Sequence, residues 1–204
     1  MNGLPNYSQL EKFHDGSNNQ LYRALRVSDR APVVIKIPRS EYPSNRELAR
    51  LYNEYHLLKQ IHAAAAQEGA TEGKARKDAS IVQVYSLEPF GRSVALVLES
   101  LPGQSLQTLL GRRALNVGEC LSVAIKIVRA LETLHARRVV HRDIKPGNIF
   151  VNDSLDQIHI IDFGIAAPLP KDGQISVAAT GIEGTLAYLA PEQTGRLNRG
   201  IDER

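Results

Sequence analysis

The feature that most constrains this chain is a short polar loop between two β-branched runs, VVHRDIKPGNIFV at residues 139–151. It contains His141, Arg142, Asp143, Lys145 and Asn148 within eight positions. The apolar runs predict that buried structure holds the loop at both of its ends. A polar loop that is held in this way is typical of a catalytic or binding site.

Composition excludes several classes of protein. The chain has 204 residues, 43% of them hydrophobic, which is enough to form a core in one large domain or two small ones. Its net charge of +3 is spread along the chain without basic runs, which argues against a nucleic-acid partner. A single cysteine, Cys120, excludes disulfide frameworks and favours a reducing compartment, so we expect a cytoplasmic protein. The polar N-terminus resembles no signal peptide, and no run of about 18 apolar residues predicts a membrane span.

The first half of the sequence predicts a small antiparallel sheet and one main helix. Short apolar stretches alternate with turn residues over 7–37, and two further strands flank a Pro-Phe-Gly turn within 80–100. Between them, apolar residues at spacings of three and four predict a helix over 43–61. Residues 62–79, rich in Ala, Gly and charge, fit a helical extension or a solvated spacer, and the spacer is favoured.

The second half predicts helices. After Pro102-Gly103 a helical pattern covers 105–113 and 117–138, and the second helix carries one apolar stripe: Leu121, Ala124, Ile125, Val128, Leu131 and Leu134. The predicted fold class is therefore α+β with two lobes, a β-rich lobe at 1–98, a hinge at 99–102 and an α-rich lobe at 103–204. Ligands bind preferentially in clefts at such joints.

Three ordered motifs carry a family resemblance. Asp143 and Asn148 in the polar loop, and Asp162 after the next apolar strand, offer the hard oxygen ligands that suit magnesium with phosphates. His141-Arg142-Asp143 with Asn148, Asp162-Phe163-Gly164 and Ala190-Pro191-Glu192 occur in the order of the protein kinase signatures. From residue 14 to residue 192 the sequence resembles a eukaryotic-type (Hanks-type) serine/threonine protein kinase domain, notably those that head large bacterial proteins with ATPase and sensor modules.

The resemblance implies a bilobal kinase-like fold and a role for each motif. Asp143 would accept or orient the proton of the attacking hydroxyl, and Lys145 would neutralise charge on the transferring phosphoryl group. Asn148 and Asp162 would hold Mg²⁺ against ATP. The acceptor would be a serine or threonine of a protein substrate.

The resemblance also places an ATP site in the first lobe. Lys36 would contact the α- and β-phosphates, held by an ion pair with Glu54 on the following helix; Glu47 is the runner-up. The predicted nucleotide-binding set is Gly16, Leu21, Val34, Lys36, Glu99, Leu101, Asn148, Phe150 and Asp162.

The glycine-rich loop departs from the family pattern. Its three glycine positions fall on His14, Gly16 and Asn19, so only one glycine remains. Because Asn tolerates positive φ better than most residues, the turn can still form. We expect ATP binding to be weakened but retained.

Other residues acquire expectations from the family as well. His141 would pack and hold backbone. Arg142 would bind a phosphate on the segment between Asp162 and Glu192, where Thr180 is a candidate phosphosite, although an unmodified Thr180 is favoured. Thr185 resembles the family threonine near the catalytic Asp and Lys, and with Lys145 it indicates serine/threonine specificity.

The resemblance also predicts missing parts. The chain ends where family members continue, so we expect an incomplete second lobe and further C-terminal domains in the full-length protein. If the reading frame stops here instead, we expect poor solubility and little turnover of the isolated chain. Glu192 would lack its arginine partner, and Leu131, Leu134 and Ile149 would lack part of their cover.

Two alternatives to an active protein kinase remain open. One is a non-catalytic ATP-binding pseudokinase, scaffold module or inactive fragment, suggested by the poor glycine loop. The other is a small-molecule kinase, which the Lys145-Pro146 pair and the Ala-Pro-Glu segment disfavour.

Overall fold

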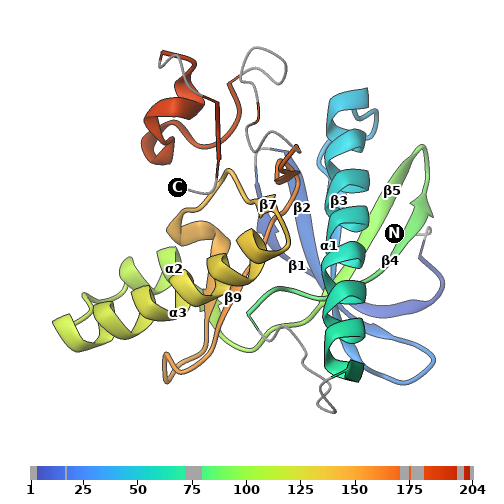
Figure 1. Cartoon of the computed structure of the whole chain (residues 1–204). Coiled ribbons are helices and arrows are strands. Elements are labelled where there is room, and N and C mark those ends of the chain that lie inside the picture. The colour runs from blue at the N-terminus through green and yellow to red at the C-terminus, as the bar shows by residue number, and fades with distance from the viewer. Residues whose placement is uncertain are drawn as a thin grey trace. The chain divides into compact units, whose positions relative to one another are not determined.

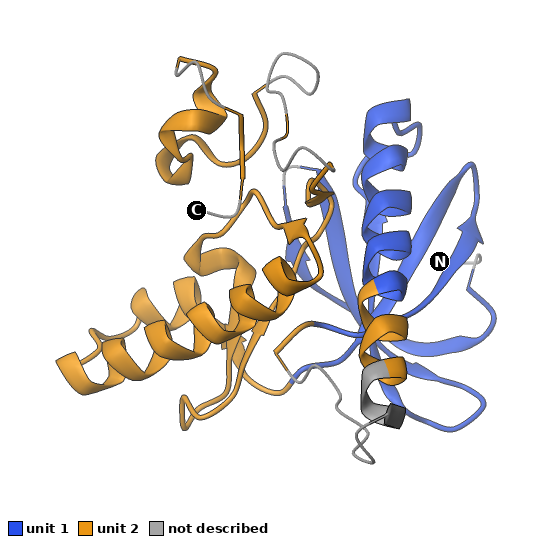
Figure 2. Cartoon of the chain, in the orientation of Figure 1, with its two compact units in different colours: residues 1–60, 82–101 blue, residues 61–81, 102–204 orange. Residues whose placement is uncertain are grey.

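The computed structural model describes residues 4–16, 18–71, 80–170, 175, 182–196 and 200–202. The chain divides into two compact units, residues 1–60 with 82–101 and residues 61–81 with 102–204 (Figure 2). The chain passes from the first unit to the second between residues 101 and 102, within the predicted hinge. The lobe boundaries themselves stay a prediction. No helix in the described ranges is both long enough and apolar enough to cross a membrane.

The first unit contains a five-stranded antiparallel sheet in the order β1-β2-β3-β5-β4 (Figure 1). The strands are β1 (Tyr7–Asp15), β2 (Asn19–Arg26), β3 (Pro32–Pro38), β4 (Val84–Phe90) and β5 (Ser93–Glu99). One face packs a core that includes Tyr22, Val33, Ile35 and Val97. Residues 95–98 of β5 are all buried, which confirms the prediction that this strand is covered on both faces.

Helix α1 (Asn45–Thr71) begins at a capping pair. The backbone N–H of Glu47 donates to Ser44 Oγ at 3.3 Å, and Glu47 Oε2 accepts from Ser44 N at 2.8 Å. The helix continues past its predicted end, so the favoured spacer interpretation was wrong for residues 62–71, while 72–79 lie outside the described residues. Alanines at 63–66 have the highest helix propensity, and Ala65 is buried, which explains the extension.

The second unit combines two helices with short strands. Its helices are α2 (Leu106–Leu110) and α3 (Val117–Ala136). A three-stranded sheet has the order β6 (Gln104–Ser105), β8 (Ile149–Val151), β9 (Ile158–Ile160), and β7 (Val139–Val140) pairs with β10 (Ala167–Pro168). Three 3₁₀ turns complete the described elements: η1 (Pro146–Asn148), η2 (Leu186–Tyr188) and η3 (Pro191–Thr194). The polar loop therefore connects β7 to β8, and the predicted α+β class is confirmed.

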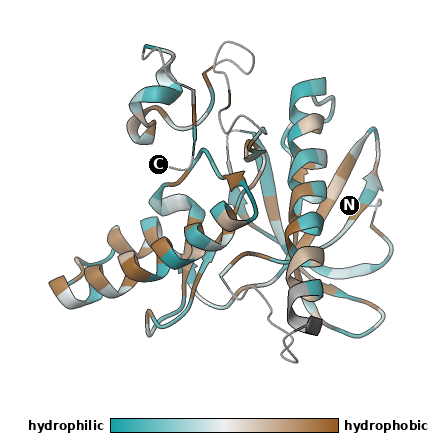
Figure 3. Cartoon of the chain, in the orientation of Figure 1, coloured by the Kyte–Doolittle hydropathy of each residue, from teal (hydrophilic) through white to brown (hydrophobic). Residues whose placement is uncertain are grey.

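The buried side of α3 differs from the predicted stripe. Apolar and polar stretches alternate along the helix (Figure 3). Three stripe members are more than half exposed, Leu121 at 59%, Ile125 at 52% and Val128 at 63%. The buried residues of α3 are Val123, Ala130 and Leu134. Leu134 and Ile149 are almost fully buried, so the expectation that they lack cover was wrong. Because α3 has apolar residues on more than one side, periodicity identified the helix but not its covered face.

Candidate active site

The carboxylate of Asp143 is held by three neighbouring side chains in the second unit. Lys145 Nζ lies 2.7 Å from Asp143 Oδ2, and Asn148 Nδ2 donates to the same oxygen at 2.9 Å. Thr185 Oγ1 donates to Asp143 Oδ1 at 2.8 Å and accepts from Lys145 Nζ at 2.6 Å. Both oxygens of the carboxylate are thereby oriented, and a positive charge lies beside it.

His141 supports this loop from inside the core. Its Nε2 lies 3.1 Å from Ile161 O, and its Nδ1 accepts from Asp143 N at 3.3 Å. A carbonyl only accepts and an N–H only donates, so the ring is neutral with its proton on Nε2. Burial lowers the pKa of His141, although Asp162 opposes this effect. These bonds confirm that His141 holds backbone.

Arg142 has an unusual backbone and a buried side chain. Its φ of 69° lies in the left-handed region, which costs a non-glycine residue about 1–3 kcal/mol. Its side chain is 3% exposed, and Nη2 lies 3.5 Å from Glu183 Oε2. Burial lowers the pKa of Arg142, and the Glu183 carboxylate opposes that shift. One partner of the Arg142 side chain is thus a carboxylate of this chain. The candidate phosphosite Thr180 lies outside the described residues.

Asp162 follows β9 and is tied to the loop through its neighbours. Ile161 N donates to Asn148 O at 3.0 Å, and the ring of fully buried Phe163 meets the edge of His141 with centroids 4.8 Å apart. Asp162 itself has φ of 66°, a second left-handed residue beside this loop. These contacts bring Asp162 and Asn148, the two predicted metal ligands, to adjacent backbone positions.

The donor set at this position fits a magnesium ion that carries phosphates. The Asn148 amide nitrogen is engaged by Asp143, so its oxygen is the atom that would bind a metal. In the described part of the chain, His, Cys, Asp and Glu form no group of three or more that could hold a metal. Two protein oxygens suit Mg²⁺, which is usually held by one or two carboxylates while water and phosphate supply the remaining ligands.

In the first unit, Lys36 and Glu54 form a buried ion pair. Lys36 Nζ lies 2.7 Å from Glu54 Oε2, with side-chain exposures of 7% and 1%. The runner-up Glu47 instead caps α1, so the structure brings Lys36 together with Glu54.

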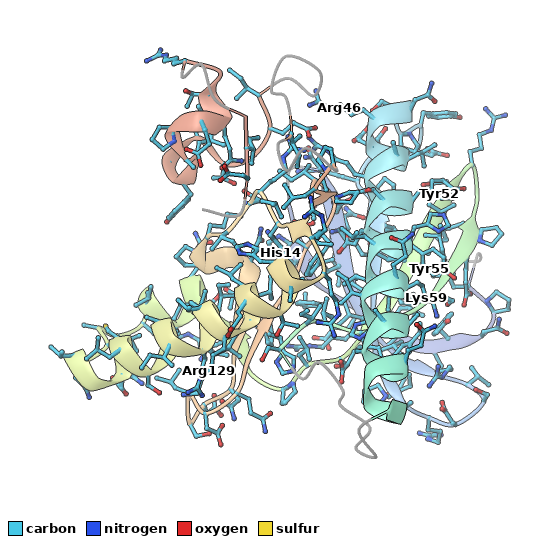
Figure 4. The ribbon with its side chains drawn as sticks, in the orientation of Figure 1. His14, Arg46, Tyr52, Tyr55, Lys59 and Arg129 are labelled. Carbon is cyan, nitrogen blue, oxygen red and sulfur yellow. The ribbon has the colours of Figure 1, made fainter. Side chains whose placement is uncertain are left out.

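Tyr52, Tyr55 and Lys59, labelled in Figure 4, also project from α1. Lys59 Nζ lies 5.8 Å from the Tyr55 ring centroid.

The sheet register places three predicted nucleotide-binding residues on one face. Leu21 is directly opposite Lys36, and Val34 precedes Lys36 by two positions on β3. Opposite residues, and residues two apart, share a face of a sheet. Leu21, Val34 and Lys36 therefore line the face opposite to Tyr22 and Ile35 of the core.

The turn between β1 and β2 is closed by a hydrogen bond from Gly16 N to Asn19 O at 3.0 Å. His14 (Figure 4) occupies the space beside it, since a Cβ on Gly16 would lie 3.0 Å from His14 Nε2. Asn19 is not among the described residues with positive φ, so the turn does not use the tolerance of Asn for that region at this position. Ser17 lies outside the described residues.

The remaining predicted nucleotide-binding residues lie in both units. Glu99 ends β5, where its Oε2 accepts from Gln83 N at 3.3 Å, and partly buried Leu101 follows it. Phe150 pairs with Ser105 between β8 and β6 of the second unit. Their role in binding a nucleotide stays a prediction, as do the roles of Asp143, Lys145, Lys36 and Glu54.

Two contacts of the loop were missed by the sequence interpretation. Glu183 reaches the Arg142 guanidinium, and Gln193 Nε2 donates to Arg142 O at 2.8 Å. The only sequence signal was that both residues flank Thr185, which had been placed near Asp143.

Comparison with known proteins assigns the family. Residues 7–202 match the protein kinase domain family, and the chain belongs to it. It is 28% identical over 188 residues to serine/threonine-protein kinase pkn2 of Myxococcus xanthus, covering 90% of this chain and 21% of that protein. It is 30% identical over 189 residues to probable serine/threonine-protein kinase PkwA of Thermomonospora curvata, covering 92% and 23%. It is 30% identical over 190 residues to serine/threonine-protein kinase PknL of Mycobacterium tuberculosis, covering 92% of this chain and 43% of that protein.

The family match confirms the predicted resemblance and the kinase-like α+β fold. The chain spans less than a quarter of the length of pkn2 and PkwA.

Proposed function

We propose that the chain transfers the γ-phosphoryl group of ATP to serine or threonine hydroxyls of a protein substrate. The observation that carries this proposal is the hydrogen-bonded set of Asp143, Lys145, Thr185 and Asn148. It supplies a fixed carboxylate to receive a proton and an ammonium beside it. The names of the bacterial relatives support serine/threonine specificity.

In this proposal Asp143 receives the hydroxyl proton while the substrate oxygen forms its bond to the γ-phosphorus. The bond from that phosphorus to the bridging oxygen breaks, and ADP leaves with the bonding electron pair. Lys145, already 2.7 Å from Asp143 Oδ2, neutralises charge that develops on the transferred group. Thr185 holds the Asp143 and Lys145 side chains in fixed positions relative to each other, because its single hydroxyl contacts both.

Asn148 and Asp162 are the residues that would hold Mg²⁺, which supplies charge neutralisation at the phosphates when it is bound. Lys36 would bind the α- and β-phosphates. Since Glu54 holds the Lys36 ammonium at 2.7 Å, a phosphate meets a donor that is already oriented. Leu21 and Val34 would cover the nucleotide base from the same sheet face.

The broader setting of the chain is also proposed. We infer a cytoplasmic kinase with lobes at 1–98 and 103–204 joined by a hinge at 99–102, and with further domains in the whole protein. The support is the lone Cys120, the change of unit at residues 101 and 102, and the greater length of the relatives.

Transfer of labelled phosphate from ATP to a generic basic protein tests the function, with Asp143→Asn as control. We expect transfer by the parent chain and at least a hundredfold loss in D143N, because base catalysis contributes about 10²–10⁴ in rate. Nucleotide binding should be retained in both, since Asn keeps the shape of Asp143, although its amide nitrogen cannot accept the hydrogen bonds that one carboxylate oxygen accepts in the parent. The non-catalytic alternative predicts equal, background signal in both chains. It is not favoured, because the relatives are named as kinases and all the predicted catalytic residues are present.

A further inference from the structure

We propose that Glu183 and Gln193 are positioning residues that act on Asp143 through the two ends of Arg142. Glu183 holds the guanidinium of Arg142, and Gln193 holds its backbone carbonyl. The inference rests on the proposed function, because it concerns the placement of the residue that accepts the proton. Asp143 follows Arg142 directly, so any rotation of the Arg142 backbone moves the Asp143 carboxylate.

The first attachment is electrostatic. A guanidinium that is 3% exposed needs an anionic partner and hydrogen-bond acceptors, because burial without them is strongly unfavourable. Glu183 Oε2 supplies the charge at 3.5 Å from Nη2, and Ile165 O accepts from Nη1 at 3.3 Å. Glu183 is itself only 15% exposed, so solvent screens this pair weakly. The Glu183 carboxylate therefore anchors the chain just before Thr185.

The second attachment is a buried amide. Gln193 Nε2 donates to Arg142 O at 2.8 Å, and Gln193 Oε1 accepts from Ala190 N at 3.1 Å. Both ends of the amide are thus used, which fixes its orientation. Gln193 is buried, and its contact fixes the carbonyl of a residue whose φ of 69° is unfavourable. It therefore opposes relaxation of the Arg142 backbone towards an ordinary conformation.

The segment between these attachments passes close to the loop at Gly184. Gly184 has φ of 118°, and a Cβ there would lie 2.6 Å from Leu189 Cδ2 and 3.2 Å from Arg142 O. Glycine lets the backbone pass at this distance. The close approach places Thr185 against both Asp143 and Lys145. Residues 183–193 therefore contact the loop at three points: the Arg142 guanidinium, the Arg142 carbonyl and the Asp143 carboxylate.

The experiment compares E183Q, E183D and Q193A with the parent, using E132Q on α3 and Q157A before β9 as matched controls at exposed positions of the same unit. The kcat for a serine peptide is normalised to sites that bind a fluorescent ATP analogue, so misfolded chain does not count. We expect E183Q and Q193A to lower kcat about tenfold with nucleotide Kd and peptide KM within twofold. E183D should recover at least threefold of the loss, and both controls should match the parent.

Hydrogen exchange of the amides at 141–148 gives a readout that does not depend on turnover. E183Q and Q193A should raise exchange there at least tenfold, and E132Q and Q157A should not. If the parent transfers no phosphate, the proposed function fails, and faster exchange in these two variants still supports the attachment. Two results overturn the proposal. One is exchange in E183Q and Q193A that equals that of the controls; the other, if the parent is active, is faster exchange in these variants with unchanged kcat.

Discussion

Thr185 Oγ1 donates a hydrogen bond to Asp143 Oδ1 at 2.8 Å, although 42 positions separate the two residues in the sequence. The same oxygen accepts from Lys145 Nζ. One hydroxyl thus links a carboxylate to an ammonium, and its proton can point in only one direction. The hydroxyl of Thr185, rather than its methyl group, should determine turnover.

Replacing Thr185 by valine removes this hydroxyl at nearly constant shape. A hydrogen bond to a charged group contributes about 1.5–3 kcal/mol, so kcat should fall about ten- to a hundredfold in T185V. T185S keeps the oxygen and should stay within about threefold of the parent. Steady-state peptide phosphorylation measures both variants. Equal rates for the two would refute a role for the hydroxyl.

Two glutamates of α1 should differ sharply on conversion to glutamine. E54Q removes the carboxylate that lies 2.7 Å from the buried Lys36 ammonium, which costs about 3–5 kcal/mol of unfolding free energy and should abolish most activity. E47Q weakens only a solvent-exposed helix cap, for a loss of about 1 kcal/mol or less with activity retained. Urea unfolding and phosphate transfer compare them. Similar losses in both variants would count against the assigned pairing.

His141 should make stability depend on pH. Burial lowers the pKa of the folded His141 below its ordinary value of 6.5, so below pH 6.5 the unfolded chain binds a proton that the folded chain excludes. Stability is therefore full above pH 6.5 and decreases as the pH falls towards the folded pKa, by at most about 1.4 kcal/mol per pH unit.

Urea unfolding between pH 7.5 and 5.0 checks this prediction, with H141F lacking the titrating group and H56N as an exposed-histidine control. The parent and H56N should show the same slope, and H141F a shallower one. In parallel, nitrogen chemical shifts at pH 7.5 should place the His141 proton on Nε2. A proton on Nδ1 there would contradict the hydrogen-bond assignment.

Gly103 and Gly91 provide a matched pair for steric constraint, since both have positive φ. A Cβ at Gly103 would lie 2.1 Å from Val151 O and 2.8 Å from Asn152 Cα, whereas a Cβ at Gly91 meets nothing within 4 Å. G91A should lose about 1–2 kcal/mol, the cost of a left-handed alanine. G103A should lose several times more, or accumulate as insoluble chain while G91A stays soluble. Equal unfolding free energies would show that the backbone at 151 and 152 can yield.

Local patterns were enough to predict most elements and the chemistry-bearing positions. Alternating apolar residues gave the strands, and the ordered motifs around Asp143 and Asp162 gave the family, which the comparison confirms. These signals lie within short stretches of sequence, where spacing and side-chain type fix the local structure.

What the sequence could not provide were the relations that depend on the folded chain. Glu183 and Gln193 reach Arg142 over 41 and 51 positions, and no spacing rule connects them. The exposed side of α3 was misassigned because Leu121 and Val128 are as apolar as the buried Leu134. The end of α1 was underestimated because an alanine run fits both a helix and a spacer until tertiary packing selects one.

The left-handed backbone of Arg142 implies a trade-off between stability and function. Glycine would occupy this conformation at little energetic cost, yet it would remove the guanidinium that Glu183 binds. The chain thus retains a residue whose backbone conformation is unfavourable, and this lowers the free energy of unfolding relative to a chain with glycine-like backbone freedom at position 142. An Arg142→Gly substitution made to raise heat resistance would therefore lower the rate of phosphate transfer.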